Sequence, residues 1–206
     1  MQIKGVVFDW SGTLSDDLRL VYEAAMHIFD RLHRKHPSFA EFKQELVIPY
    51  MDFYRKYFPR MKKADRDRWF LEAIQKVGEP VPFAGIDRLL WSLREQEKRL
   101  AVLSSVHQIE LLSEASQYGF LDHFEELNGG VHDKTEALAE IMDRRRLMPQ
   151  EVAYVGDMVH DIEVGRQAGV ITVAVSWGYD SRKKLLNARP DHIVNSVEEL
   201  ESLLNS

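Results

Sequence analysis

From residue 86 to its end the chain alternates between helix-like and strand-like segments, and this alternation constrains the fold most. Apolar runs predict strands at Leu100–Leu103, Val152–Val155, Ile171–Val175 and His192–Val194, with a weaker extended piece at Phe124–Leu127. Helical patterns separate them, at Ile86–Glu97, Gln108–Tyr118, Lys134–Arg146, Asp161–Ala168, Ser181–Ala188 and Val197–Leu204. Because strands separated by helices pair in parallel, the pattern predicts an α/β fold with a doubly wound, Rossmann-like parallel sheet.

The N-terminal part of the chain begins with one more strand and then breaks the alternation. Ile3–Phe8 is strand-like, whereas apolar residues from Ser15 to Gly78 recur at helical spacing and many are aromatic. Ser38 follows a proline and is suited to cap a helix, and Pro80–Gly85 is typical of a linker. We therefore expect an α/β catalytic core at 1–14 and 82–206. An inserted all-helical cap domain at 15–81 would cover the site, with most of its aromatic residues forming its own core.

Composition limits the partners of the chain. Its 206 residues carry a formal net charge of -6, which argues against nonspecific nucleic-acid binding because that binding needs a basic face. There is no cysteine, so disulfides and zinc–thiolate sites are excluded and a cytoplasmic location is expected. We expect no signal peptide, and no apolar run approaches the roughly 20 residues that span a bilayer.

Asp9 follows the first predicted strand directly, in the run Val6-Val7-Phe8-Asp9-Trp10-Ser11-Gly12-Thr13. Gly12 and Thr13 indicate a tight turn just after this carboxylate. In open parallel sheets, ligands bind beyond the carboxyl ends of the strands. Asp9 is therefore expected at the floor of a binding site.

Three later segments carry polar side chains that fit the same site. They are Ser104-Ser105 after a predicted strand, Lys134 at the start of a predicted helix, and Gly156-Asp157 after a strand with Asp161 four residues on. Taken singly, each residue also fits a structural role, as a helix cap or a solvated charge. Their combination favours one site, because a carboxylate, a hydroxyl, an ammonium and a carboxylate pair form a coherent set for phosphoryl transfer.

The roles in such a site follow from the chemistry of each group. Ser104 and Lys134 would bind phosphate oxygens, with Ser105 and Thr13 as further substrate-binding residues. Asp9 and Asp157 would hold Mg²⁺, which takes oxygen ligands in octahedral geometry. Attack by Asp9 would form an aspartyl-phosphate that water then releases.

These motifs resemble those of the haloacid dehalogenase superfamily, in its phosphoglycolate-phosphatase-like branch. The family's Asp-x-Asp-Gly-Thr motif corresponds to Asp9–Thr13, and its Gly-Asp-x-x-x-Asp motif to Gly156–Asp161. Ser104 and Lys134 match the two motifs between them, although the proline that usually follows the lysine is absent. The resemblance implies a mobile helical cap, Mg²⁺ as cofactor and a phosphorylated substrate, with Asp161 binding the metal through water or orienting its neighbours.

Ser11 departs from the family pattern, because the resemblance implies an aspartate there that acts as general acid and base. The pKa of a serine hydroxyl is far too high to exchange protons near neutrality, although the Ser11 backbone carbonyl is still able to bind the metal. General acid–base catalysis contributes roughly 10²- to 10⁴-fold, or about 3–5 kcal/mol of barrier. We expect a slow phosphatase, or one that recruits a proton shuttle such as Asp16, Asp17, His107 or His160.

Two other functions remain open at this point. Phosphonoacetaldehyde hydrolases resemble this first motif, with a tryptophan after the nucleophile and a small residue at the next position, and they hold substrate as a Schiff base on a cap lysine. The cap lysines here are Lys43, Lys56, Lys62 and Lys63. A phosphate- or metabolite-binding protein that has lost turnover is the second alternative. Dehalogenation is disfavoured, because dehalogenases need no metal and the Gly156–Asp161 motif is intact.

The sequence thus predicts a Mg²⁺-dependent phosphoric monoester hydrolase acting through Asp9 on a small phosphorylated metabolite, as a monomer or homodimer without nucleic-acid or membrane partners. The expected catalytic residues are Asp9, Ser11, Ser104 and Lys134. The expected metal ligands are Asp9, Ser11, Asp157 and Asp161.

Overall fold

The computed structural model describes residues 2–47, 49–131 and 133–205 and divides into two compact units. One, the α/β unit, comprises Met1–Asp16 and Val81–Ser206, and the other, the helical unit, comprises Asp17–Pro80. Among the described residues, no helix is both long and apolar enough to cross a membrane.

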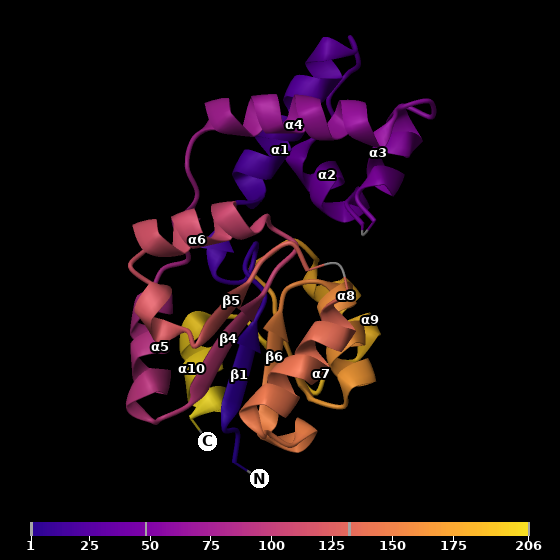
Figure 1. The fold of residues 1–206 in the computed structure, drawn as a ribbon. Coiled ribbons are helices and arrows are strands. Elements are labelled where there is room, and N and C mark those ends of the chain that lie inside the picture. Colours follow the sequence, from indigo (N-terminus) through magenta and orange to yellow (C-terminus); the bar gives the residue numbers. More distant parts are fainter. Residues whose placement is uncertain (1, 48, 132, 206) are drawn as a thin grey trace. The chain divides into compact units, whose positions relative to one another are not determined.

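The α/β unit is built on a six-stranded sheet in the order β5-β4-β1-β6-β7-β8, and every neighbouring pair is parallel (Figure 1). The strands are β1 (Gly5–Phe8), β4 (Arg99–Leu103), β5 (Glu126–Asn128), β6 (Val152–Gly156), β7 (Ile171–Val175) and β8 (His192–Val194). The helices are α5 (Ile86–Glu95), α6 (Gln108–Gln117), α7 (Lys134–Arg145), α8 (Val159–Ala168), α9 (Arg182–Ala188) and α10 (Val197–Leu204). This confirms the predicted doubly wound α/β fold.

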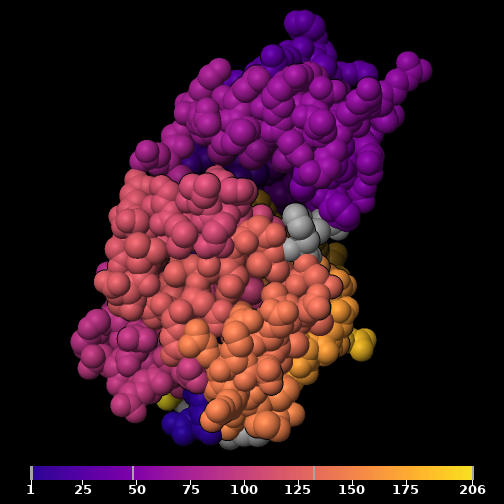
Figure 2. Space-filling model, viewed as in Figure 1, coloured from indigo at the N-terminus to yellow at the C-terminus, as the bar shows by residue number. Residues whose placement is uncertain are grey.

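Helices cover both faces of the sheet because side chains of a strand alternate between its faces. On β1, Val6 and Phe8 belong to a hydrophobic cluster with apolar side chains of α5, α6 and α10. Val7 belongs to a second hydrophobic cluster, with apolar side chains of α7 and α8. β1 is buried along its whole length. On the face of this unit that Figure 2 shows, the surface is formed largely by the salmon-to-orange part of the chain.

One short element was not predicted. β2 (Ser15–Asp16) pairs antiparallel with β3 (Val81–Pro82), so part of the expected linker is a strand and both segments belong to the α/β unit. Strands of two residues carry too little alternation to be read from sequence. The extended piece expected at Phe124–Leu127 lies at Glu126–Asn128, because Leu121–His123 forms a 3-10 turn first.

The helical unit contains α1 (Leu18–Arg31), α2 (Phe39–Glu45), α3 (Met51–Tyr57) and α4 (Lys63–Val77). Ser38 caps α2 as predicted, accepting from the Glu41 amide at 3.2 Å while the Glu41 carboxylate accepts from the Ser38 amide at 2.7 Å. The aromatic residues form the unit's own core. Phe29 is fully buried, with its ring 4.9 Å from those of Tyr57 and Phe58 and 6.2 Å from that of Phe53.

Replacing Phe29 with alanine tests this aromatic core. We expect Phe29→Ala to lower the free energy of unfolding by about 3–5 kcal/mol, because it leaves a cavity in the packed centre. Leu71→Ala, on the exposed surface of α4, should change that energy by no more than about 0.5 kcal/mol. Urea unfolding followed by circular dichroism measures both, and similar effects of the two variants would contradict the assignment of Phe29 to the core.

Candidate active site

Asp9 follows β1, the strand at which the strand order of the sheet reverses. β1 is central, with β4 on one side and β6 on the other, and Phe8 at its end pairs with Val102 and Val155. The chain fills one half of the sheet with β4 and β5 and then crosses to β6, β7 and β8 on the other half. Such a switch point opens a crevice beyond the carboxyl ends of the strands. The residues that follow these strand ends, Asp9, Ser104 and Asp157, are therefore placed around one crevice.

Lys134 connects two of the predicted carboxylates. Its Nζ lies 3.0 Å from Oδ1 of Asp9 and 2.9 Å from Oδ1 of Asp161, and all three side chains are buried. Burial alone would lower the pKa of Lys134, but the carboxylates of Asp161 and Asp9 raise it well above its usual value. Lys134 is therefore a fixed cation, and its position is set by Asp133, whose carboxylate caps α7.

Asp161 is itself held by groups that the sequence analysis did not single out. The Tyr154 hydroxyl donates to Oδ1 of Asp161 at 3.1 Å, and the Met158 amide donates to Oδ2 at 3.1 Å. Tyr154 lies within the buried strand β6, and a buried tyrosine usually needs a partner for its hydroxyl. That requirement was the available signal for its role. Asp161 thus orients Lys134 while its own two oxygens are both occupied.

Asp157 is enclosed by backbone and needs glycine on two sides. Its Oδ1 accepts from the Thr13 hydroxyl at 3.0 Å and its Oδ2 accepts from the Tyr179 amide at 2.6 Å. A Cβ atom on Gly12 would lie 2.3 Å from Oδ2, and one on Gly178 would lie 2.2 Å from it. Gly12 also has a φ of +74°, which disfavours any side chain there. The Thr13 hydroxyl, expected to bind substrate, is used here to hold Asp157.

The three carboxylates make the site strongly acidic. Oxygen atoms of Asp9, Asp157 and Asp161 lie within 4.8 Å of one another, and Lys134 is the cation that contacts two of them. Burial raises the pKa of Asp9 to about 6, against the influence of Lys134, and burial with the charges of Asp161 and Asp9 raises the pKa of Asp157 well above its usual value. Buried oxygen donors with excess negative charge fit a hard divalent cation such as Mg²⁺.

The predicted serines lie at the same edge of the sheet but make different contacts. Ser104 is buried, and its Oγ accepts from the Val106 amide at 3.1 Å. Ser105 is exposed beside it. Ser11 is half-buried in the turn after β1 and forms an isolated bridge with Ser15. The residues considered as proton shuttles lie on different elements: Asp16 is exposed on β2, Asp17 precedes α1, His107 caps α6, and His160 lies in the first turn of α8.

A second polar cluster fixes the turn behind Asp9. The Trp10 indole donates to Oε2 of Glu114 at 2.6 Å, and the Ser15 hydroxyl donates to the same oxygen at 3.2 Å. The Tyr118 hydroxyl lies 2.8 Å from that of Ser15, and its ring stacks on Trp10 at a 5.7 Å centroid distance. Glu114 on α6 therefore ties both ends of the Trp10–Ser15 turn to the helix that follows Ser104. Sequence reasoning missed it, since one glutamate on a helix gives no signal.

Comparison with known proteins agrees with this geometry. A family model described as haloacid dehalogenase-like hydrolase matches residues 6–175. The chain is 27% identical to a phosphoglycolate phosphatase of Synechococcus elongatus, covering 96% of this chain and 95% of that protein. It is 26% identical to the tyrosine-protein kinase PtkA of Mycobacterium tuberculosis, over 96% of this chain and 70% of that protein.

A haloacid dehalogenase-like family hydrolase from Streptococcus pneumoniae has the same fold. Its solved structure superposes with a TM-score of 0.85 at 20% identity, and the match covers 98% of both chains. The fold of this chain is therefore that of the haloacid dehalogenase-like hydrolases.

The excess negative charge of the site gives a prediction that needs no substrate. In EDTA, Asp157→Asn should raise the free energy of unfolding, because it removes one of the mutually repelling buried carboxylates. Mg²⁺ should raise the melting temperature of the wild type but not of this variant. Thermal unfolding with and without Mg²⁺ measures both, with exposed Asp122→Asn as the control. Equal Mg²⁺ responses of wild type and Asp157→Asn would contradict the proposed site.

The cluster around Glu114 gives a prediction on pH. Burial and the nearby Glu110 raise the pKa of Glu114, although hydrogen bonds from Trp10 and Ser15 oppose this. The native protein thus holds this proton more tightly than the unfolded chain, so the stability contributed by Glu114 falls as pH rises above the unfolded value of about 4.3 and through the raised pKa.

Glu114→Gln keeps an acceptor oxygen without this titration. Relative to wild type it should therefore gain stability between acidic and neutral pH, in urea unfolding curves recorded across that range. Glu114→Leu should instead cost about 1–3 kcal/mol throughout, because two donors lose their acceptor. Parallel pH curves for wild type and Glu114→Gln would show that Glu114 does not titrate abnormally.

Proposed function

The chain belongs to the haloacid dehalogenase-like hydrolase family, and on that premise we propose that it is a phosphatase whose Asp9 takes the phosphoryl group of a small phosphorylated metabolite. The observation that carries this proposal is the buried cluster of Asp9, Lys134 and Asp161, together with Asp157. The likeness to a phosphoglycolate phosphatase supports the same reaction class.

The proposed reaction has two steps. In the first, a carboxylate oxygen of Asp9 attacks phosphorus, the bond from phosphorus to the leaving oxygen breaks, and an aspartyl-phosphate forms. In the second, water attacks that phosphorus, phosphate leaves, and the Asp9 carboxylate is regenerated with release of a proton. Lys134, fixed 3.0 Å from Asp9, would stabilise the negative charge of the phosphoryl oxygens in both steps.

The metal belongs to the same proposal. Mg²⁺, held by Asp9, Asp157 and the Ser11 backbone carbonyl, with Asp161 acting through water or on its neighbours, would neutralise the phosphoryl charge. The protein's own contribution is to hold these oxygens in place. Thr13 and the Tyr179 amide fix Asp157, and Tyr154 fixes Asp161.

Ser11 is expected to make the two steps unequal in rate. A hydroxyl at this position donates a hydrogen bond but supplies no proton to a poor leaving group and takes none from water. An activated leaving group needs no proton, so only the second step should be slow with such a substrate. The aspartyl-phosphate should then accumulate.

Rapid mixing with 4-nitrophenyl phosphate tests the proposal. With Mg²⁺ we expect a burst of 4-nitrophenolate close to one equivalent per protein, followed by slow turnover, and no burst from Asp9→Asn. Ser11→Asp should raise the slow rate by roughly 10²- to 10⁴-fold, because it restores an acid and base. Release no greater than from Asp9→Asn would overturn the phosphatase proposal. Fast turnover without a burst would keep the phosphatase and overturn the role given to Ser11.

A second candidate, hydrolysis of a phosphonate, is favoured by Trp10 and Ser11 beside the nucleophile. It needs an uncharged lysine in the helical unit to form a Schiff base. Lys63 is paired with Asp67 at 2.6 Å, and its hydrogen bonds to Asp67 and Tyr50 raise its pKa, while Lys56 is paired with Glu45 at 2.5 Å. Lys63 is thus held in the charged form. Phosphate release from phosphonoacetaldehyde, with none from 4-nitrophenyl phosphate, would establish this function instead.

A further inference from the structure

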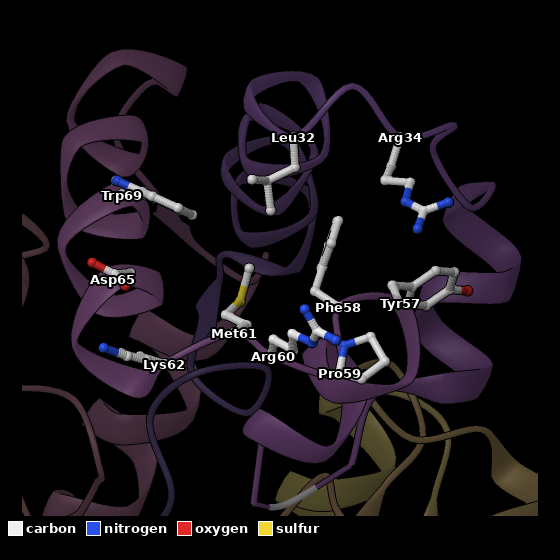
Figure 3. Close-up of a pocket in the computed structure, with 10 residues that line it drawn as sticks. All are labelled: Leu32, Arg34, Tyr57, Phe58, Pro59, Arg60, Met61, Lys62, Asp65 and Trp69. Carbon is white, nitrogen blue, oxygen red and sulfur yellow. The ribbon is translucent and has the colours of Figure 1, made fainter.

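The helical unit contains a pocket of its own, with a volume of about 410 Å³ (Figure 3). Its walls come from the segment after α1, the end of α3, the segment 58–62 and the first turns of α4. All of these residues lie within Asp17–Pro80. The aspartates of the candidate active site and Lys134 belong instead to the α/β unit. The volume is within the range of about 300–1,000 Å³ that is typical of small-molecule sites.

The inner surface of the pocket is apolar and aromatic. Figure 3 shows Leu32, Phe58, Met61 and Trp69 pointing into the hollow from three different segments. Two of these rings are held by neighbours: Phe58 packs edge-to-face on Phe29 at 4.9 Å, and the guanidinium of Arg31 lies over Trp69 at 5.1 Å. A rigid surface of this kind favours a flat apolar ring.

The charges around the pocket are positive and uncompensated. Arg34, Arg60 and Lys62 line it, and none of them has an ion-pair partner among residues 17–47 and 49–80. The carboxylate that also lines it, Asp65, is already paired with Arg68 at 3.2 Å. Several other cations of the unit are paired, as Arg31 is with Glu72 and Lys56 with Glu45. An anion would therefore be attracted here in a chain whose net charge is -6.

We propose that this pocket binds a small organic anion consisting of a flat apolar ring that carries a carboxylate or another planar acid group. The ring would lie among Phe58, Met61 and Trp69. The acid group would be bound by the guanidinium groups of Arg34 and Arg60, whose planar donors match a carboxylate. This site goes beyond the proposed hydrolysis and does not depend on it.

Isothermal titration calorimetry with 1-naphthoate on the chain of residues 1–206 tests the proposal. We expect a dissociation constant on the order of 1 mM or tighter for a ligand of this size. The neutral 1-naphthamide, with the same ring, should bind at least about tenfold more weakly, because it loses the charge-assisted hydrogen bonds. This comparison needs no variant.

Two double variants place the binding site. Arg34→Gln with Arg60→Gln should weaken 1-naphthoate binding at least about tenfold. Lys35→Gln with Lys76→Gln makes the same change in net charge on the same unit, at residues that do not line the pocket, and should leave the binding unchanged. No binding of 1-naphthoate at millimolar concentration, equal binding of the amide, or equal loss in both double variants would each overturn the proposal.

Discussion

The contact between Lys134 and the two carboxylates beside it is the interaction on which the candidate site depends. A lysine that is almost fully buried would lose its proton or destabilise the fold without a counter-charge, and Asp9 and Asp161 supply that charge at 3.0 and 2.9 Å. The same contact lowers the pKa of Asp9, which burial alone would raise further. Asp9 and Lys134 thus depend on each other, and Asp157 is the carboxylate of the cluster that has no ion pair with Lys134.

Around this contact the fold supplies hydrogen-bond donors that hold the aspartate carboxylates in place. Tyr154 comes from the sheet, Thr13 from the turn after β1, and the Tyr179 amide from the segment after β7. Glu114 adds a connection from α6 to the turn, so the helix that follows Ser104 also fixes the residues next to Asp9. Since side chains held by packing and hydrogen bonds lose little entropy on binding, such a site is preorganised for a charged group.

The sequence allowed the fold and the members of the acidic cluster to be predicted, but not the groups that hold them. Strand and helix alternation identifies a parallel sheet, and such a sheet brings its strand ends to one edge, so Asp9 and Asp157 could be expected together. Glu114 and the β2–β3 pair have no such rule, because their roles arise from contacts between residues as far apart as 104 positions. For Tyr154, burial signals that the hydroxyl has a partner but does not identify Asp161 as that partner. Thr13 shows the same limit: its position was predicted, but the direction of its hydroxyl was not.

Trp10 holds the backbone of the turn on which Ser11 lies. The Trp10 side chain is fully buried and bonded to Glu114, so the backbone of the turn is held independently of whatever side chain stands at position 11. A carbonyl contact from Ser11 to a metal needs only that backbone, whereas proton transfer needs the aspartate that is absent. Under the proposed mechanism, Ser11 would therefore separate two functions that one aspartate would combine: the turn would keep the geometry for phosphoryl capture, and the acid–base step alone would be weakened. Under the same proposal, the aspartyl-phosphate would form faster than water releases it.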